Sequence, residues 1–371
     1  NISVMASSLT SYDPQLAQNA AMSPPKLIPF SAIESILLKL LSTPDGVESI
    51  FASQRRAFIQ STQKAKDDGI SSSLPIQTAG QPPQPTMKAG EGAQVCIKTG
   101  YTKNGDVMVS KVAAGGGTAS NTGAVFVYHQ SNLRLKAVLC DEGLLTEVRT
   151  AAACAYASKF LLGEQNLKKI QKIGIVGGGV QAVWQLRLLG AALSTTSSSF
   201  QKKVVIKTTS RETAEAFIER MASSSYHPDR EWKFEHYSDS KDGGEGFRGC
   251  QLIHSLTPSR APVVALDDVQ IGVGTVLHIT AVGADSPGKM ELDANLIRKA
   301  DTLICDSISQ SKCRGEFQPS EFWESLVEIG TLMDGNHTNG VELEGSFSIF
   351  DSSGLPLQDV EMANLISEQL D

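Results

Sequence analysis

The sequence lacks the cysteine and histidine spacings that bind metals or build a disulfide framework. Its six cysteines are scattered through 371 residues with no C-x-x-C pair, and its six histidines show no spacing typical of metal ligands. We therefore expect free thiols in a reducing, cytoplasmic setting, and no metal site.

An excess of positive charge and a long apolar run are also missing. The formal net charge is −7, which argues against a surface that binds nucleic acid. No apolar run approaches the length of a membrane span. Residues 1–25 have neither the basic nor the apolar segment of a secretory signal, and we expect them to form a disordered lead.

The chain is long enough for two domains. Up to about residue 150, apolar residues recur first with helical and then with alternating spacing. This spacing predicts two helices, a set of antiparallel strands and a long connecting helix. The corresponding residues are 28–42 and 47–66, then 95–97, 107–112, 124–128 and 137–140, and finally 141–162.

Residues 172–193 follow a strand, glycine turn and helix pattern that is typical of dinucleotide-binding units. In such units one glycine makes the turn, and a second lets the backbone approach the pyrophosphate. The N–H groups at the start of the helix then face the phosphates. The alternative is a glycine-rich loop that binds no ligand. The predicted cofactor contacts in this stretch are Gly177, Gly178, Gly179, Val180, Gln181 and Ala182.

Strand and helix patterns alternate after this motif, which favours a parallel, doubly wound sheet. The expected strands are 203–208, 251–255, 276–282 and 302–306, and the expected helices are 212–223 and 294–300. The tail offers a strand at 346–349 and a helix at 360–370. We expect both to lie outside this sheet and to return to the first domain.

The residues after the second strand of this unit bear on the identity of the dinucleotide. An acidic residue there is typical of NAD sites, but this chain has Thr209, Ser210 and Arg211. A guanidinium and hydroxyl groups suit a 2′-phosphate, so NADP(H) is favoured. NAD(H) stays possible because Glu212 is near, and Ser210 has the alternative role of capping the following helix.

Three charged residues occupy positions where a purely structural role would be unusual. Lys111 alternates with Val107 and Val109, so it shares their face, and Arg149 has helical spacing with apolar neighbours. Asp285 follows a predicted strand, at the edge of the sheet where ligands collect. The alternatives are an edge strand for Lys111, a surface ion pair for Arg149 and a simple turn for Asp285.

Several stretches together resemble the ornithine cyclodeaminase/mu-crystallin family. The most specific are L-T-x-x-R-T-A-A at 145–152 and V-G-A-D-x-P-G-K-x-E-L at 282–292. Stretches 95–101, 109–112, 175–182 and 349–359 also match. The resemblance implies an α/β fold, with a central Rossmann-type doubly wound domain at 151–334. It also implies an α+β substrate-binding and dimerisation domain formed by both chain ends, 26–150 and 335–371, and a homodimer.

The resemblance also assigns roles to the charged residues. Lys111 and Arg149 match the family's ligands for the substrate carboxylate, and Asp285 matches its acid/base residue. Two cations would fix the carboxylate of an α-imino acid, and a carboxyl group beside the nitrogen would move its proton. We expect Lys111 to be the charged neighbour of Asp285. Lys98 is a further candidate for the substrate, and Thr257, Val282 and Gly283 are further candidates for the cofactor.

The sequence departs from the family pattern at two places. Residues 81–88 lack the arginine that members usually carry upstream of the first strand, and Lys88 is a possible substitute as a point charge. The loop at 113–122 is shorter than usual and rich in glycine, which leaves Thr118 as the candidate for a family threonine.

The family implies three kinds of activity. We favour an NAD(P)H-dependent oxidoreductase of α-imino or α-amino acids, either a ketimine reductase or an alanine dehydrogenase. An ornithine cyclodeaminase, which is a lyase, uses the same groups. A mu-crystallin-like protein would bind NADPH and thyroid hormone without turnover, but the presence of Asp285 argues against a pure binder.

Overall fold

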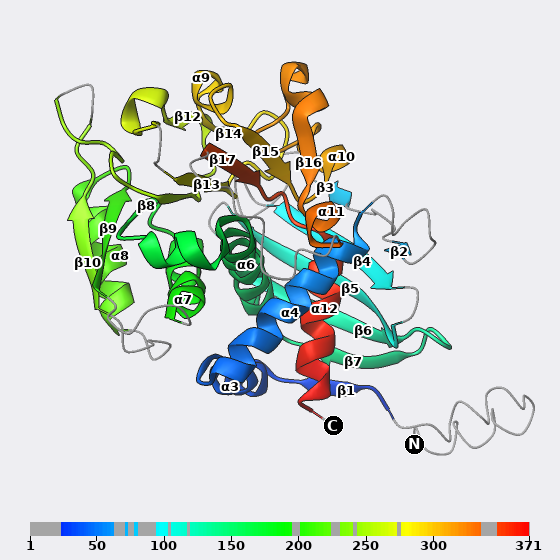
Figure 1. Ribbon diagram of the computed structural model, residues 1–371. Helices are drawn as coiled ribbons and strands as arrows, with labels where there is room; N and C mark the ends of the chain where they lie inside the picture. Colours follow the sequence, from blue (N-terminus) through cyan, green and yellow to red (C-terminus); the bar gives the residue numbers. More distant parts are fainter. Residues whose placement is uncertain are drawn as a thin grey trace, which may run out of the picture.

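The structure is a computed structural model, and it describes most of the chain. The described residues are 24–62, 71–72, 78–80, 94–102, 105–116, 119–194, 201–223, 231–239, 243–272, 276–334 and 347–370. The lead expected at 1–25 lies almost wholly outside these ranges. Two large sheets, separated by helices, dominate the described part (Figure 1).

The first sheet has seven strands in the order β1-β7-β6-β5-β4-β2, with β3 also paired to β4. Neighbouring strands are antiparallel except for β1 and β7, which confirms the antiparallel set expected from the alternating spacing. The strands are Lys26–Ile28, Ser71–Ser72, Thr78–Gly80, Gln94–Thr102, Val107–Gly116, Ala119–His129 and Leu135–Leu139 for β1 to β7.

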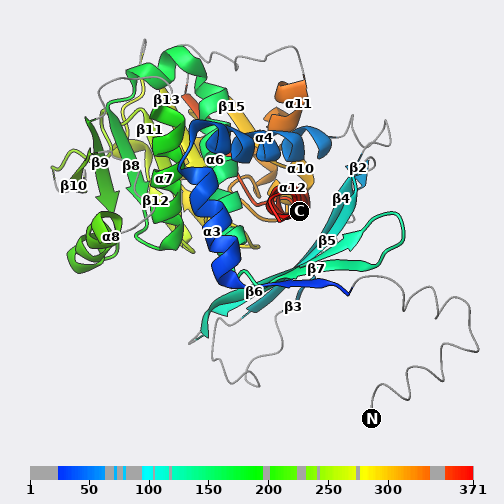
Figure 2. The same cartoon turned by 90° about the horizontal axis from the view of Figure 1, so that it is seen from below.

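Helices α3 (Phe30–Leu41), α4 (Pro44–Gln60) and α12 (Pro356–Glu368) gather over one face of this sheet (Figure 2). The spacing had placed the first helix at 28–42, but Ile28 belongs to β1. The second helix starts earlier than expected because the Thr43 side chain accepts a hydrogen bond from Gly46 N and caps it. The end expected at residue 66 lies outside the described residues.

The second sheet has eight strands, all parallel, in the order β10-β9-β8-β11-β13-β17-β15-β16. This confirms the doubly wound fold. Its strands in chain order are β8 Lys172–Val176, β9 Gln201–Lys207, β10 Glu231–His236, β11 Leu252–Ser255, β13 Leu277–Ala281, β15 Thr302–Cys305, β16 Leu326–Glu328 and β17 Phe347–Asp351. Its helices and turns include α7 (Val180–Ser194), α8 (Arg211–Ser223), α9 (Ala294–Ile297), α10 (Ile308–Ser311), η3 (Ser320–Ser325) and α11 (Ile329–Asp334). Strands β12 (Arg260–Val264) and β14 (Met290–Leu292) form a small separate sheet, near the short turn η2 (Leu266–Asp268).

The expectation that the whole tail would leave this sheet is wrong for its strand. β17 pairs in parallel with both β13 and β15, and all five of its residues are buried. A strand covered on both faces gains more from burial in the centre of a sheet than at an edge. The tail helix does return to the first sheet, because α12 packs against α4, α6, β4 and β5.

Helix α6 (Leu144–Lys169) lies between the two sheets and packs against α4, α7, α12 and β13 (Figure 1). It is longer than the expected 141–162, with a kink at Gly163. Among the described helices, none is both long and apolar enough to cross a membrane. Because α6 packs on β13 of the second sheet and on α4 and α12, which cover the first sheet, residues in its first turns are placed to join the two halves of a site.

Candidate functional site

Three buried cations meet above the inner face of the first sheet. Lys98 on β4 stands directly opposite Lys111 on β5 in the antiparallel register, so both side chains point to the same face. Arg149 comes from the second turn of α6. All three are almost completely buried. This excludes an edge strand for Lys111 and a surface ion pair for Arg149.

Asp359, in the first turn of α12, provides the counter-charge for two of these cations. Lys111 Nζ donates to its Oδ1 at 2.8 Å, and Arg149 Nε lies 3.0 Å from the same oxygen as an ion pair. Gln358 accepts a 2.7 Å hydrogen bond from Arg149 Nη1. Burial alone would raise the pKa of Asp359, but Arg149, Lys111 and Lys98 outweigh it and hold the pKa below its usual value.

Lys98 has a weaker partner than the other two cations. Its Nζ donates to the carbonyl of Gly354 at 3.3 Å. In the described part of the chain, no carboxylate lies within ion-pair distance of it. Burial, with the nearby charges of Arg149 and Lys111, lowers the pKa of Lys98 to about 7. Burial likewise lowers the pKa of Lys111, against the opposing charge of Asp359.

The turn that carries Gly354 is held in place by hydrogen bonds to a buried acid. Asp306, just after β15, accepts hydrogen bonds from the hydroxyls of Ser352 and Ser353 and from Gly354 N, the last at 2.6 Å. A Cβ added to Gly354 would stand 2.9 Å from Arg149 Nη1 and 3.1 Å from Lys98 Nζ. Glycine is therefore the residue that lets two cations flank this turn.

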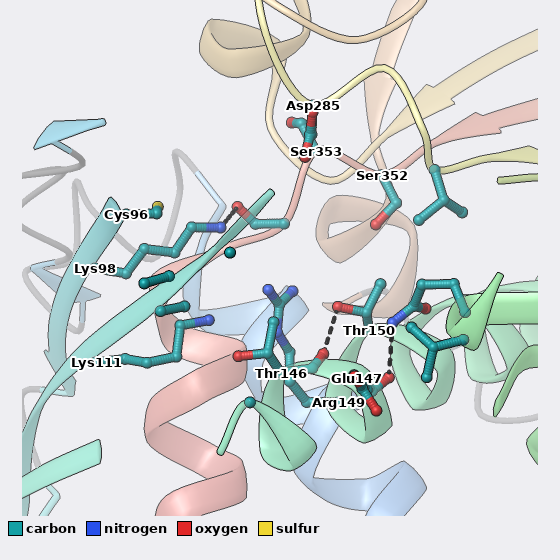
Figure 3. Close-up of a pocket in the computed structure, with 18 of the residues that line it drawn as sticks. Cys96, Lys98, Lys111, Thr146, Glu147, Arg149, Thr150, Asp285, Ser352 and Ser353 are labelled. Atoms are coloured by element: carbon teal, nitrogen blue, oxygen red, sulfur yellow. Dashed lines mark hydrogen bonds between the residues drawn. The ribbon is translucent and has the colours of Figure 1, made fainter. Parts of the chain in front are cut away.

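A cavity of about 560 Å³ opens above the cations. Figure 3 shows Lys98, Lys111 and Arg149 on one side of it and Asp285 on another. Asp285 follows β13 and is exposed, and its Oδ1 accepts a 2.5 Å bond from Lys289 Nζ. The expectation that Lys111 is the charged neighbour of Asp285 is therefore wrong, because Asp359 holds Lys111 and Lys289 holds Asp285.

The edge of the second sheet beside Asp285 is braced by Glu291. Its buried carboxylate accepts hydrogen bonds from the side chain of Ser255, from both N and Oγ1 of Thr257, and from Gly283 N. A Cβ on Gly283 would meet the backbone of Thr257 at 2.0 Å. Val282 lines the cavity. Glu291 thus ties together the ends of β11 and β13, where the cofactor contacts were expected.

The glycine turn has the geometry of a phosphate-binding turn. Gly177 has a φ of +104°, and Ala182 is fully buried against the sheet. A Cβ at Gly178 would touch Thr208 Cγ2 at 3.1 Å, whereas one at Gly179 would meet no atom within 4 Å. The backbone at Gly179 is therefore open to a ligand, and α7 begins at the next residue. Val180 and Gln181 line the same cavity as the cations. These features fit a dinucleotide.

The residues proposed to distinguish NADP(H) from NAD(H) lie at the exposed start of α8. Arg211 Nε donates to Glu215 at 2.9 Å. Ser210 Oγ accepts a bond from Thr213 N, so Ser210 does cap the helix, and Thr209 is exposed. These contacts do not test whether Arg211 binds a 2′-phosphate, so the preference for NADP(H) stays a prediction.

The sequence did not indicate some of the residues of the site, and two residues that it did indicate are not described in the structure. Lys88 and Thr118 lie outside the described residues. Asp359, Asp306 and Glu291 received no role, although all three carboxylates organise the site. Thr146 was also missed: its hydroxyl lines the cavity one turn before Arg149, buried and without a hydrogen-bond partner among the described residues. A threonine three residues before an inward arginine was the available signal.

Comparison with known proteins shows the family of the chain. The model of the ornithine cyclodeaminase/mu-crystallin family matches residues 111–371, and the chain belongs to that family. The chain is 30% identical to an alanine dehydrogenase of Archaeoglobus fulgidus over 66% of this chain and 70% of that protein. It is 27% identical to an iminosuccinate reductase of Paracoccus denitrificans over 75% and 82%.

The fold is also that of a solved archaeal alanine dehydrogenase, described as a dimer with bound NAD. The two chains superpose with a TM-score of 0.68 at 23% identity, over 93% of this chain and 95% of the other. Relatives of the chain thus include NAD-dependent oxidoreductases. The family model begins at residue 111, so Lys98 lies before the matched part of the sequence.

Proposed function

We propose that this protein is an NAD(P)H-dependent oxidoreductase that acts on α-imino or α-amino acids. The observation that carries the proposal is one cavity lined by three groups of residues: the cations Lys111 and Arg149, the start of the glycine-turn helix at Val180 and Gln181, and Asp285. The alanine dehydrogenase and iminosuccinate reductase among the relatives support this class of reaction.

Each residue has a defined task in this reaction. Lys111 and Arg149 bind the substrate carboxylate, which orients the adjacent α-carbon toward the mouth of the glycine turn. Asp285 gives a proton to the imine nitrogen during reduction, or takes one from the amine during oxidation. The nicotinamide cofactor, when bound, supplies or accepts the hydride. Lys111 and Arg149 are buried, which keeps their charges strong because little water reaches them.

We further propose how the chain divides between these tasks. Residues 26–150 and α12 form the substrate-binding and dimerisation part, and residues 151–334 with β17 form the cofactor part. Gly177 to Ala182 would hold the pyrophosphate, with Thr257, Val282 and Gly283 at the neighbouring strand ends. NADP(H) is favoured over NAD(H) because the start of α8 carries Arg211 and no acid precedes it.

A homodimer through the outer face of the first sheet is part of the same proposal. That face carries apolar side chains that are only partly buried, namely Met108, Val112, Phe126, Tyr128 and Val138, and Figure 2 shows the helices on the opposite face. Such a surface is typical of subunit contacts. Light scattering should report a dimer, and Phe126→Glu should give a monomer; a monomeric wild-type protein would contradict this part.

The assay that tests the activity uses a panel of substrates. Piperideine-2-carboxylate, pyrroline-2-carboxylate and pyruvate with ammonia are each incubated with NADPH or NADH while absorbance at 340 nm is followed, and ornithine is tested for ammonia release. We expect reduction of at least one imine. Ammonia release from ornithine alone would identify a cyclodeaminase, and no turnover on any substrate would leave a binding protein.

The variant Asp285→Asn tests the acid/base role. Turnover should fall about 10²- to 10⁴-fold, the usual contribution of a positioned proton donor. Cofactor affinity, measured by quenching of tryptophan fluorescence, should stay within a factor of two or so. The surface variant Lys168→Gln, which loses only an exposed ion pair on α6, serves as control. Full activity of Asp285→Asn would refute the assignment.

A further inference from the structure

The walls of the cavity hold more positive than negative charge. Asp359 is shared by Lys111 and Arg149, so that group of three has a net charge of about +1. The two acids that line the cavity itself, Glu147 and Asp285, already accept hydrogen bonds from Trp184 Nε1 and Lys289 Nζ. One substrate carboxylate therefore balances Lys111, Arg149 and Asp359, and Lys98 is left over.

Lys98 also lines a part of the cavity wall that is separate from Arg149. It lies on β4 beside Cys96, and the residues that continue the cavity along β5 are small, Ala113 and Gly115. The Gly354 turn stands between its ammonium group and the guanidinium of Arg149. Because its hydrogen-bond partner is a neutral carbonyl at 3.3 Å, a carboxylate arriving in the cavity would be a much stronger partner.

We propose that Lys98 binds a second carboxylate of the substrate, so that the protein acts best on α-imino or α-amino acids whose side chain ends in a carboxylate. This rests on the function proposed above and specifies its substrate class. The same geometry disfavours diamino acids, because a side-chain ammonium near Lys98 would meet a like charge, and the acids of the cavity wall are already engaged.

The surroundings of Lys98 make this binding sensitive to pH. The charged or titratable groups that face it are Lys111 on β5, Arg149 on α6, Asp359 on α12, Cys96 on β4 and Asp306 after β15. With a pKa of about 7, the ammonium is charged below neutrality and loses its proton above it. A second carboxylate favours the charged form, so its binding takes up a proton above pH 7 and weakens as pH rises.

Two substrates that differ by one carboxylate test the proposal. Oxaloacetate with ammonia forms a dicarboxylic imine, and pyruvate with ammonia forms the monocarboxylic one. For the wild type, kcat/KM should be higher for the dicarboxylic imine. Lys98→Gln should lower that value about 10- to 100-fold, the loss of one charge-assisted bond. It should change the value for the monocarboxylic imine by less than about 3-fold. Lys98→Arg should retain the preference, and Lys168→Gln is the control lysine.

A binding measurement separates this subsite from the activity. Calorimetry with succinate and butyrate, which share a four-carbon chain, should show tighter binding of succinate to the wild type. The difference should shrink between pH 6 and pH 8 and disappear in Lys98→Gln. Equal losses for both ligands, or for both imines, would mean that Lys98 binds the same carboxylate as Arg149, and the subsite would be refuted. If succinate binding depends on Lys98 but no imine is reduced, the proposed function fails while the subsite stands.

Discussion

Lys111 Nζ donates a 2.8 Å hydrogen bond to Asp359 Oδ1 across 248 residues of sequence, and both side chains are buried. Asp359→Asn would leave the buried charges of Lys111 and Arg149 without their counter-ion. Breaking a buried pair in this way typically costs about 3–5 kcal/mol. We expect a loss of that size in the free energy of unfolding, measured with urea, together with weaker substrate binding.

The matched control is Glu361→Gln, two residues later on α12. Glu361 is buried and accepts a 2.8 Å bond from Arg56, whose side chain is 48% exposed. Water therefore reaches the cation of this pair, and glutamine keeps an acceptor for it, so Glu361→Gln should cost less stability than Asp359→Asn. If the two variants lost the same stability, the Lys111–Asp359 pair would contribute no more to the packing of α12 against β5 than the half-exposed pair does.

Gly354→Ala should damage the site rather than the fold. Its φ is +83°, so alanine there costs roughly 1 kcal/mol of backbone strain. In addition, the new Cβ would push on Arg149 Nη1 and Lys98 Nζ. We expect KM for the imino acid to rise at least about tenfold, measured by steady-state kinetics, with cofactor affinity unchanged.

Gly243→Ala isolates the strain from the contact. Gly243 has the same φ of +83°, but a Cβ there meets no atom within 4 Å. This variant should lose similar stability and keep the wild-type KM. A similar rise of KM in both variants would show that general destabilisation, not the displaced cations, is responsible.

Local patterns in the sequence predicted the parts of the site that depend on local geometry. The alternation at Val107, Val109 and Lys111 placed the lysine on the buried face, and helical spacing placed Arg149 inward, as the structure shows. The glycine turn was predicted in the same way, because a positive φ at Gly177 is a property of a few neighbouring residues.

Long-range pairing could not be predicted in this way. Nothing near Asp359 indicates that its partners are Lys111 and Arg149, because only the path of the chain brings α12 beside β5 and α6. For the same reason the order of strands was missed. The apolar run of β17 does predict a buried strand, but its insertion between β13 and β15 depends on competition among all the strands for the centre of the sheet.

Arg211→Gln tests the cofactor preference. If Arg211 binds the 2′-phosphate, KM for NADPH should rise about 10- to 100-fold, the loss of one charge-assisted contact, while KM for NADH changes little. Glu215→Gln should have the opposite effect on KM for NADPH, because Glu215 accepts a 2.9 Å bond from Arg211 in the wild type and so competes with the phosphate. Removing that competitor should lower KM for NADPH. Equal effects on both cofactors would contradict the NADP(H) preference.

Asp351, at the end of β17, makes stability depend on pH. It is buried, and it accepts bonds from Ser311 Oγ and Glu316 N. Burial, followed by the charges of Asp306 and Glu291, raises its pKa from 3.8 to about 8. The folded state therefore keeps a proton that the unfolded state loses near pH 4, and this contribution to stability is lost as pH rises toward 8.

Asp351→Asn removes that dependence while keeping an oxygen for Glu316 N. Relative to the variant, the wild type should lose about 1 kcal/mol of unfolding free energy per pH unit between pH 5 and pH 8, measured by urea unfolding at several pH values. Asp301→Asn provides the comparison, because Asp301 is exposed and its Oδ2 accepts a 2.8 Å bond from Phe347 N at the other end of β17. Its effect should be constant over the same range. A parallel pH profile for wild type and Asp351→Asn would show that Asp351 is ionised in the folded protein, with its charge stabilised by the Ser311 and Glu316 donors.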